Sequence, residues 1–218
     1  MISTITIAGQ SIQLVALPTH PGLAQVEFQM TDAVAIDSSP FTGQTQAQQW
    51  LGADMWSGTM TLPPLRQCDK QNWAAALAQL RGMAYAMQLS DPLYTGPQGT
   101  PLVATGTTPL IPATVTNVAG DQALFTANWK ASTANLLKRG DYLQVGYRLH
   151  IVLDPVTSDG SGNATIPIWP SLREAPTAGA AIILNKPAGL FRRAKNQQGW
   201  SVDQSRLSRM SFPVVEYR

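Results

Sequence analysis

The sequence predicts a mainly β protein, with one α-helix flanking a first sheet and a separate β module after it. Apolar and polar residues alternate along several segments, which is typical of half-buried strands. One segment only has apolar residues at helical spacing, and Gly- and Pro-rich turns separate the others. These observations together favour sheets as the main building elements.

Three strands are expected early in the chain, over residues 4–7, 26–30 and 56–62, where apolar and polar side chains alternate. In the third strand, Trp56 and Met60 share one face with Gly58 and Leu62. The opposite face consists of Ser57, Thr59 and Thr61. The strand should end at the Pro-Pro pair that follows, because proline has no N–H to donate to a ladder.

One helix is predicted next. Trp73, Leu77 and Leu80 recur at helical spacing, with alanines between them. Asp69 is expected to be its N-cap and Gly82 its C′ residue, the position where a left-handed glycine commonly ends a helix. A helix with one apolar face should cover one side of a sheet.

After a short strand over residues 85–89, residues 93–107 form a predicted loop, and the chain from about 108 to 190 has β patterning only. Gly120-Asp121 and residues 159–162 are expected to be hairpin turns. This region should form a compact barrel or sandwich. Its candidate strand residues include Val115, Val118, Leu124, Phe125, Leu149, Ile151, Ile166 and Ile168.

Residues 210–217 form a last β-rich segment that needs a pairing partner. We expect it to return to the first sheet. The predicted organisation is therefore a discontinuous host domain, residues 1–92 with about 195–218, and an inserted domain of about residues 108–190.

Composition narrows the function classes. Only 13% of the 218 residues are charged, which indicates either a surface covered by partners or a polar, uncharged one. Residues 1–129 contain 3 Lys/Arg and 7 Asp/Glu, whereas residues 130–218 contain 12 and 6. The single cysteine excludes an intrachain disulfide, and no signal peptide or membrane span is expected.

No constellation of catalytic residues is recognisable, so we expect a protein that is not an enzyme and has no cofactor or metal. Neither His20 nor His150 is paired in sequence with a nucleophile, and Cys68 is expected to be a buried structural thiol. Asp159 and Asn163 are interpreted as turn residues, since the segment lacks the order of a calcium loop. Arg139-Gly140-Asp141 is likewise interpreted as a turn.

Two sets of residues are candidates for packing and binding. Trp56, Met60 and Trp73 are expected to build the core or a ring contact. Arg192, Arg193 and Trp200 are the candidate partner interface. They lie in a basic C-terminal quarter, for which an acidic protein interface or a plain solvated face is a more natural interpretation than nucleic-acid binding. Trp50 is expected to be a core or interface anchor.

Several short motifs are spread over most of the chain. They are Trp50 to Pro64, the helix with Trp73 and Gly82, Tyr85 to Pro92, Arg139 to Gly146, Gly160 to Gly162, Ile168 to Arg173 and Pro187 to Phe191. In these motifs the chain resembles the distal tail (Dit-like) proteins of long-tailed bacteriophages, the siphophages.

The resemblance implies a tail-tube-like β-sandwich with one flanking helix, plus an inserted small β-barrel that projects outward. Such proteins form a ring, usually a hexamer, at the tip of the tail, between the tail tube protein and the hub protein. Tape-measure, fibre or receptor-binding proteins are further implied partners. The implied location is the virion, after assembly in the cytoplasm of the bacterial host. The alternative is a carbohydrate- or receptor-binding module of a phage baseplate, using Trp169 or Trp129.

Overall fold

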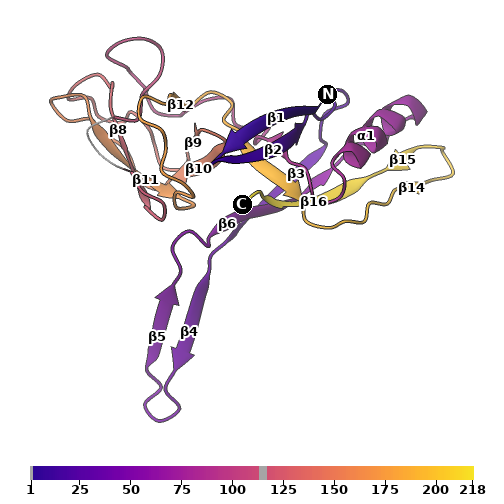
Figure 1. Cartoon of the computed structure of the whole chain (residues 1–218), viewed down its shortest axis with the longest axis horizontal. Coiled ribbons are helices and arrows are strands. Elements are labelled where there is room, and N and C mark those ends of the chain that lie inside the picture. The colour runs from indigo at the N-terminus through magenta and orange to yellow at the C-terminus, as the bar shows by residue number, and fades with distance from the viewer. Residues whose placement is uncertain (1, 113–116) are drawn as a thin grey trace. The chain divides into compact units, whose positions relative to one another are not determined.

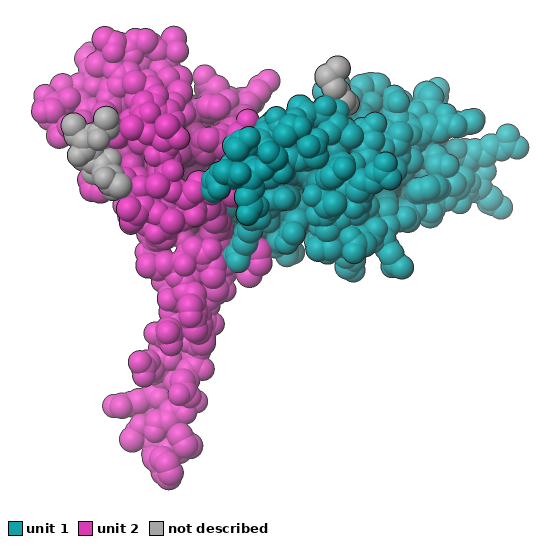
Figure 2. All heavy atoms as spheres, viewed as in Figure 1, with its two compact units in different colours: residues 1–29, 56–93, 188–218 teal, residues 30–55, 94–187 magenta. Residues whose placement is uncertain are grey.

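The structure is a computed structural model that describes residues 2–112 and 117–218. The fold is mainly β, and its described residues contain a single helix (Figure 1). Val115, expected in a strand, lies outside the described residues. Two compact units are present (Figure 2). Unit 1 comprises residues 1–29, 56–93 and 188–218, and unit 2 comprises residues 30–55 and 94–187.

Unit 1 is built on a five-stranded sheet in the order β3-β6-β16-β13-β7. Its strands are β3 (Gln25–Thr31), β6 (Met55–Thr61), β16 (Ser211–Glu216), β13 (Gly189–Arg193) and β7 (Met87–Leu89). The pairs β6–β16, β16–β13 and β13–β7 are antiparallel. The prediction that the C-terminal segment returns to the first sheet is confirmed, because Phe212 pairs with Met60 in the β16–β6 ladder.

The expected alternation of the third strand is also confirmed. In β6, Trp56, Gly58 and Met60 are buried, and the residues between them are half-buried. Gly58 is required where β3 crosses β6, because a Cβ there would collide with the backbone carbonyl of Glu27. The β6 tryptophan packs edge-on against Phe28, with ring centroids 5.8 Å apart.

The helix α1 (Gln67–Gln79) covers this core with Trp73, Ala76 and Leu77. Its ends differ from the prediction. The N-cap is Arg66, so Asp69 lies inside the first turn, where its carboxylate still faces the positive end of the helix dipole. Leu80 is the C-cap, which places Gly82 one residue beyond C′. The backbone pairing of Leu65 with Ser208 fixes the chain just before the helix and so sets its start.

Two hairpins complete unit 1. The first pairs β1 (Ile2–Ile7) with β2 (Gln10–Val15). Val15 N–H of β2 donates to the Ala86 carbonyl, and Ala86 N–H donates to the Gln13 carbonyl of β2. These hydrogen bonds pair β2 with the residue just before β7. The second pairs β14 (Ser201–Val202) with β15 (Ser208–Arg209). The predicted linker over residues 192–209 is thus partly strand, since β13 also extends through Arg192 and Arg193.

Unit 2 contains a second five-stranded sheet, in the order β12-β9-β10-β11-β8. Its strands are β12 (Ile182–Ile183), β9 (Tyr142–Val145), β10 (Arg148–Val152), β11 (Ala164–Trp169) and β8 (Ala123–Thr126). Leu110 bridges to Ala181 beside β12 and to Ala127 beside β8. One chain segment therefore hydrogen-bonds near both edges of the sheet and curls it around its core.

The core of unit 2 lies inside this curl and includes Leu124, Trp129, Leu143 and Ile166, all fully buried. The predicted turns are present: Val118 N–H donates to the Asp121 carboxylate at 2.8 Å. The Asp159 carboxylate accepts from backbone N–H groups after it, including that of Asn163, at 2.8 Å. Val118 itself is exposed and belongs to the turn.

One hairpin was not predicted. β4 (Val34–Ser38) and β5 (Thr45–Gln49) pair with each other, and residues 30–55 belong to unit 2. The predicted domains, residues 1–92 with about 195–218 and about 108–190, did not treat this segment separately. These domain limits stay a prediction.

Candidate assembly surface

The most exposed element is the β4–β5 hairpin, and we call residues 32–54, which contain it, the arm. Every residue of both strands is exposed. Figure 2 shows the arm as a narrow extension of unit 2. A two-stranded hairpin is at best marginally stable in water without further packing. The arm therefore has little packing against the rest of the chain to stabilise it.

The two faces of the arm differ. Cross-strand partners share a face, so Val34, Ile36 and Ala47 lie on one side and Asp37 lies with Gln46 and Gln48 on the other. The Ile36 side chain is 72% exposed. The arm is amphipathic, and its apolar face lies open.

The tip of the arm, residues 39–44, adds a larger apolar group. Ser39 N–H donates to the Gln44 carbonyl at 2.9 Å, which closes the turn. Phe41 lies within this turn with 95% of its surface exposed. Residues 32–54 contain acidic side chains and no lysine, arginine or histidine. The arm therefore presents an aromatic tip on an acidic element.

Both ends of the arm are anchored within unit 2. At the first end, Trp169 Nε1 donates to Asp32 Oδ1 at 2.7 Å. At the second end, the buried Asp54 carboxylate accepts from Ser171 N–H and Ser171 Oγ, both at 2.6 Å, and from Arg173 Nη1 at 3.3 Å. Gly52 also donates its N–H to Ser171 Oγ at 2.8 Å. The exposed strands thus start and end at fixed points.

The Asp54 anchor is a buried ion pair with its hydrogen bonds satisfied. Burial alone would raise the pKa of the Asp54 carboxyl, but the Ser171 hydrogen bonds and the Arg173 charge lower it below its ordinary value. Asp54 therefore stays ionised in the folded protein. Removing either charge would leave the other buried without its partner.

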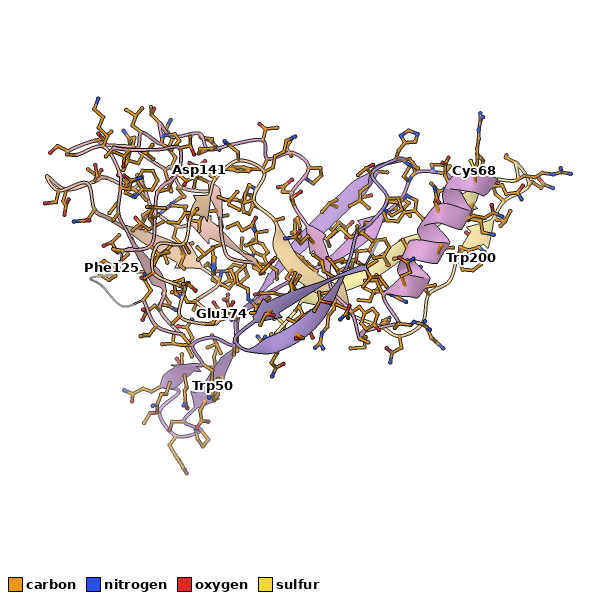
Figure 3. The ribbon with its side chains drawn as sticks, turned by 45° about the horizontal axis from the view of Figure 1, so that its top comes forward. Trp50, Cys68, Phe125, Asp141, Glu174 and Trp200 are labelled. Atoms are coloured by element: carbon orange, nitrogen blue, oxygen red, sulfur yellow. The ribbon has the colours of Figure 1, made fainter. Side chains whose placement is uncertain are left out.

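Unit 1 contains a hollow of about 380 Å³ between the end of β6 and the β14–β15 hairpin, which we call the Trp200 groove. Its lining residues are Thr61, Leu62, Pro64, Gly199, Trp200, Ser201, Arg209, Met210 and Ser211. Trp200 (labelled in Figure 3) is 49% exposed. Lys70 Nζ lies 4.9 Å from the centre of its ring. The groove combines an aromatic wall with a cationic rim.

The predicted core residues lie together. Trp56, Met60 and Trp73 are all buried in unit 1, at 2% exposure or less. Trp73 Nε1 donates to the Pro21 carbonyl at 3.1 Å, and its ring lies 6.3 Å from that of Phe212. These residues therefore form part of the core of unit 1. That they also contribute to a ring contact stays a prediction.

The predicted partner residues do not form one surface. Trp200 lines the groove, but Arg193 is buried, and its guanidinium donates to the Gln197 carbonyl. Arg192 is half-buried over the Tyr217 ring, 5.8 Å from its centre. Neighbours in β13 point to opposite faces of the sheet, so the two arginines cannot share a contact surface. Arg209 accompanies Trp200 instead, which the sequence reasoning did not predict.

Of the other candidates from the sequence, His150 and Asp141 are buried and hydrogen-bonded, and Cys68 is exposed. His150 is buried, its Nδ1 lies 2.7 Å from the Pro170 carbonyl, and burial lowers its pKa to about 4. Asp141 of the Arg-Gly-Asp string is buried and accepts from Gln98 N–H at 2.7 Å. The expectation of a buried Cys68 is wrong: the thiol is exposed on the first turn of α1, because that side of the helix faces away from the core.

The aromatic residues proposed for sugar stacking are also placed. Trp129 is fully buried, so it offers no platform, and the Trp169 ring nitrogen is bonded to Asp32. Trp50, expected to be an anchor, is half exposed at the end of β5. Phe125, expected from the sequence only as a strand residue, lies in β8 and is 42% exposed.

Comparison with known proteins shows no matching protein family and no matching characterised protein. Within residues 2–112 and 117–218, no cluster of His, Cys, Asp and Glu could hold a metal ion. Over the same ranges, no helix is long and apolar enough to cross a membrane.

Proposed function

We propose that this protein is a structural subunit of a ring at the distal end of a phage tail, and that it is not an enzyme. The observation that carries the proposal is the amphipathic arm, with Ile36 and Phe41 exposed to solvent. An element of this kind is explained by a permanent partner that covers its apolar face.

The edges of the unit 1 sheet support the same proposal. β3 ends that sheet, and no strand in the described part of the chain pairs with its outer side. An open sheet edge and an apolar arm each favour pairing with a further copy, and closing a ring removes such edges. The low charge of the chain, 13%, suits a surface that is largely covered by other subunits.

In this proposal, unit 1 is the tail-tube-like β-sandwich that forms the ring, a hexamer by analogy with the Dit-like proteins that the chain resembles. The curled sheet of unit 2 is the small β-barrel inserted into it. The ring would join the tail tube protein to the hub and to tape-measure, fibre or receptor-binding proteins. Its place would be the tail tip of the virion.

The test is the mass of the full chain by light scattering, followed by negative-stain imaging. Closed rings of about six copies with a central hole are the expected result. A chain that stays a monomer across the accessible concentration range, including with candidate tail tube and hub proteins present, would refute the proposal.

A second candidate is a carbohydrate-binding module, favoured by one hollow of about 590 Å³ in unit 2. Phe125, Asp159, Asn163 and Thr165 line it, so an aromatic ring lies near groups able to bind hydroxyls. Glycan-array binding by the full chain that is lost in Phe125→Ala would support this function. No binding to any glycan would contradict it.

A further inference from the structure

The arm needs a receptor surface, and the Trp200 groove has the matching chemistry. We propose that the arm of one copy seats its Phe41 tip in the Trp200 groove of a second copy. This inference rests on the proposed function, because it names the surface through which the subunits of the assembly join.

Apolar complementarity is the first argument. The tip presents Phe41 at 95% exposure. The groove offers the ring of Trp200, which is 49% exposed, next to the buried side chains of Leu62 and Met210, within a hollow of about 380 Å³. Burying an aromatic side chain against such a surface contributes favourably to association, and aromatic rings are common anchors of interfaces.

Charge complementarity is the second argument. Asp37 lies in β4, one residue before that strand ends, and is exposed, and the arm contains no lysine, arginine or histidine. The groove has Arg209 in its lining and Lys70 over Trp200. Opposite charges at an interface steer encounter and fix orientation.

A second groove in unit 1 is a poorer match. It measures about 460 Å³, and its lining includes Leu14, Leu17, Leu23 and Trp73. No charged side chain lines it. It has no group to pair with Asp37, so the Trp200 groove is the better receptor for an acidic arm.

Arm-to-groove docking is a heterologous contact, because each copy gives its arm to one neighbour and its groove to another. Two arms packed face to face would instead bring two acidic elements together with no cation between them. Heterologous contacts continue from copy to copy and close into a ring when the rotation permits.

The experiment uses two exposed substitutions in the full chain, Phe41→Ser in the arm and Trp200→Ala in the groove. Each variant alone should fall from the ring mass to the monomer mass, with association weakened roughly thirtyfold or more, as for a central interface residue. An equimolar mixture should give a complex of two chains only. In it, the intact arm of one variant fills the intact groove of the other.

Matched controls are Leu93→Ser, at a side chain 89% exposed, and Phe125→Ala, at one 42% exposed. Both should assemble as the wild type does. Unchanged circular dichroism and thermal unfolding would establish that the arm and groove variants are folded.

Three results overturn the inference. The first is a Trp200→Ala chain that assembles normally, which would mean that the arm docks elsewhere. The second is a mixture that stays monomeric although each variant is folded, as expected if the arm docks on its own chain. The third is a monomeric wild-type chain, which would also refute the proposed function, whereas the first two leave the ring itself standing.

Discussion

The two five-stranded sheets differ in how far their edge strands are hydrogen-bonded by other parts of the chain. In unit 2, Leu110 bridges beside both β12 and β8, and the Asn117 side chain bonds the outer edge of β8. Asn117 Oδ1 accepts from Phe125 N–H at 2.7 Å, and its Nδ2 donates to the Phe125 carbonyl at 3.1 Å. One buried amide thus occupies hydrogen-bonding groups that another strand would use.

In unit 1, β7 is covered through Ala86, but β3 ends the sheet with no described strand beyond it. The arm strands likewise pair only with each other among the described residues. The sheet of unit 2 therefore has its edges hydrogen-bonded within the chain, whereas β3 and the arm have edges that no described strand pairs with.

The largest expected effect concerns the closed core. Trp129→Ala should reduce the free energy of unfolding by about 4 kcal/mol, because it empties a fully buried aromatic site. Phe41→Ala should change it by less than about 0.5 kcal/mol in the monomer, since that side chain contacts little. Urea denaturation measures both. Equal losses at the two sites would break the comparison.

The next effect concerns the anchor of the arm. Asp54→Ala should cost about 3 kcal/mol, because Arg173 would remain buried without its carboxylate. Asp37→Ala, at an exposed acid of the arm, is the matched control and should cost almost nothing. Chemical denaturation of both variants checks this. If Asp54→Ala left the free energy of unfolding unchanged, the ion pair with Arg173 would not be needed to hold that end of the arm.

The stability of unit 2 should also depend on pH through His150. Its folded pKa of about 4 lies below the ordinary value of 6.5, so the unfolded chain binds more protons between these two values. Stability should therefore be complete above pH 7 and fall by about 2 kcal/mol on going to pH 5. His150→Gln should lack this loss, and an unchanged pH dependence in the variant would contradict the assignment.

The smallest expected effect concerns the edge of β8 that the Asn117 side chain covers. Asn117→Ala should cost about 1 kcal/mol, because two hydrogen bonds to the backbone of Phe125 are lost. The freed edge of β8 should then promote concentration-dependent association, which light scattering measures. Asn163→Ala, at an exposed turn amide, is the control. A variant that stays as dispersed as the wild type would show that the edge needs no such protection.

Much of the fold was predictable from local patterns. The alternation in β6 and the spacing of Trp73 and Leu77 identified a strand and a helix, because each follows from the geometry of its own backbone. The helix ends were wrong, since the pairing of Leu65 with Ser208, far away in sequence, decides where α1 begins. Local signals cannot include a contact of that range.

The candidate site was predicted only in part. Trp200 was singled out with two arginines of β13, but strand geometry separates those arginines and burial removes Arg193. The arm was missed because its strands are rich in Gln, Thr and Ala, which give no strong apolar alternation. Its significance lies in exposure, and exposure is a property of the folded chain.

The sequence by itself determined the mainly β character, the single helix and the return of the last strand to the first sheet. Periodicity and turn residues suffice for these, since they depend on neighbours in the chain. The tertiary structure alone decided which edges are closed, that Asp54 meets Arg173, and that Phe41 remains in solvent. These depend on residues brought together from distant parts of the sequence, and local pattern contains no information about such meetings.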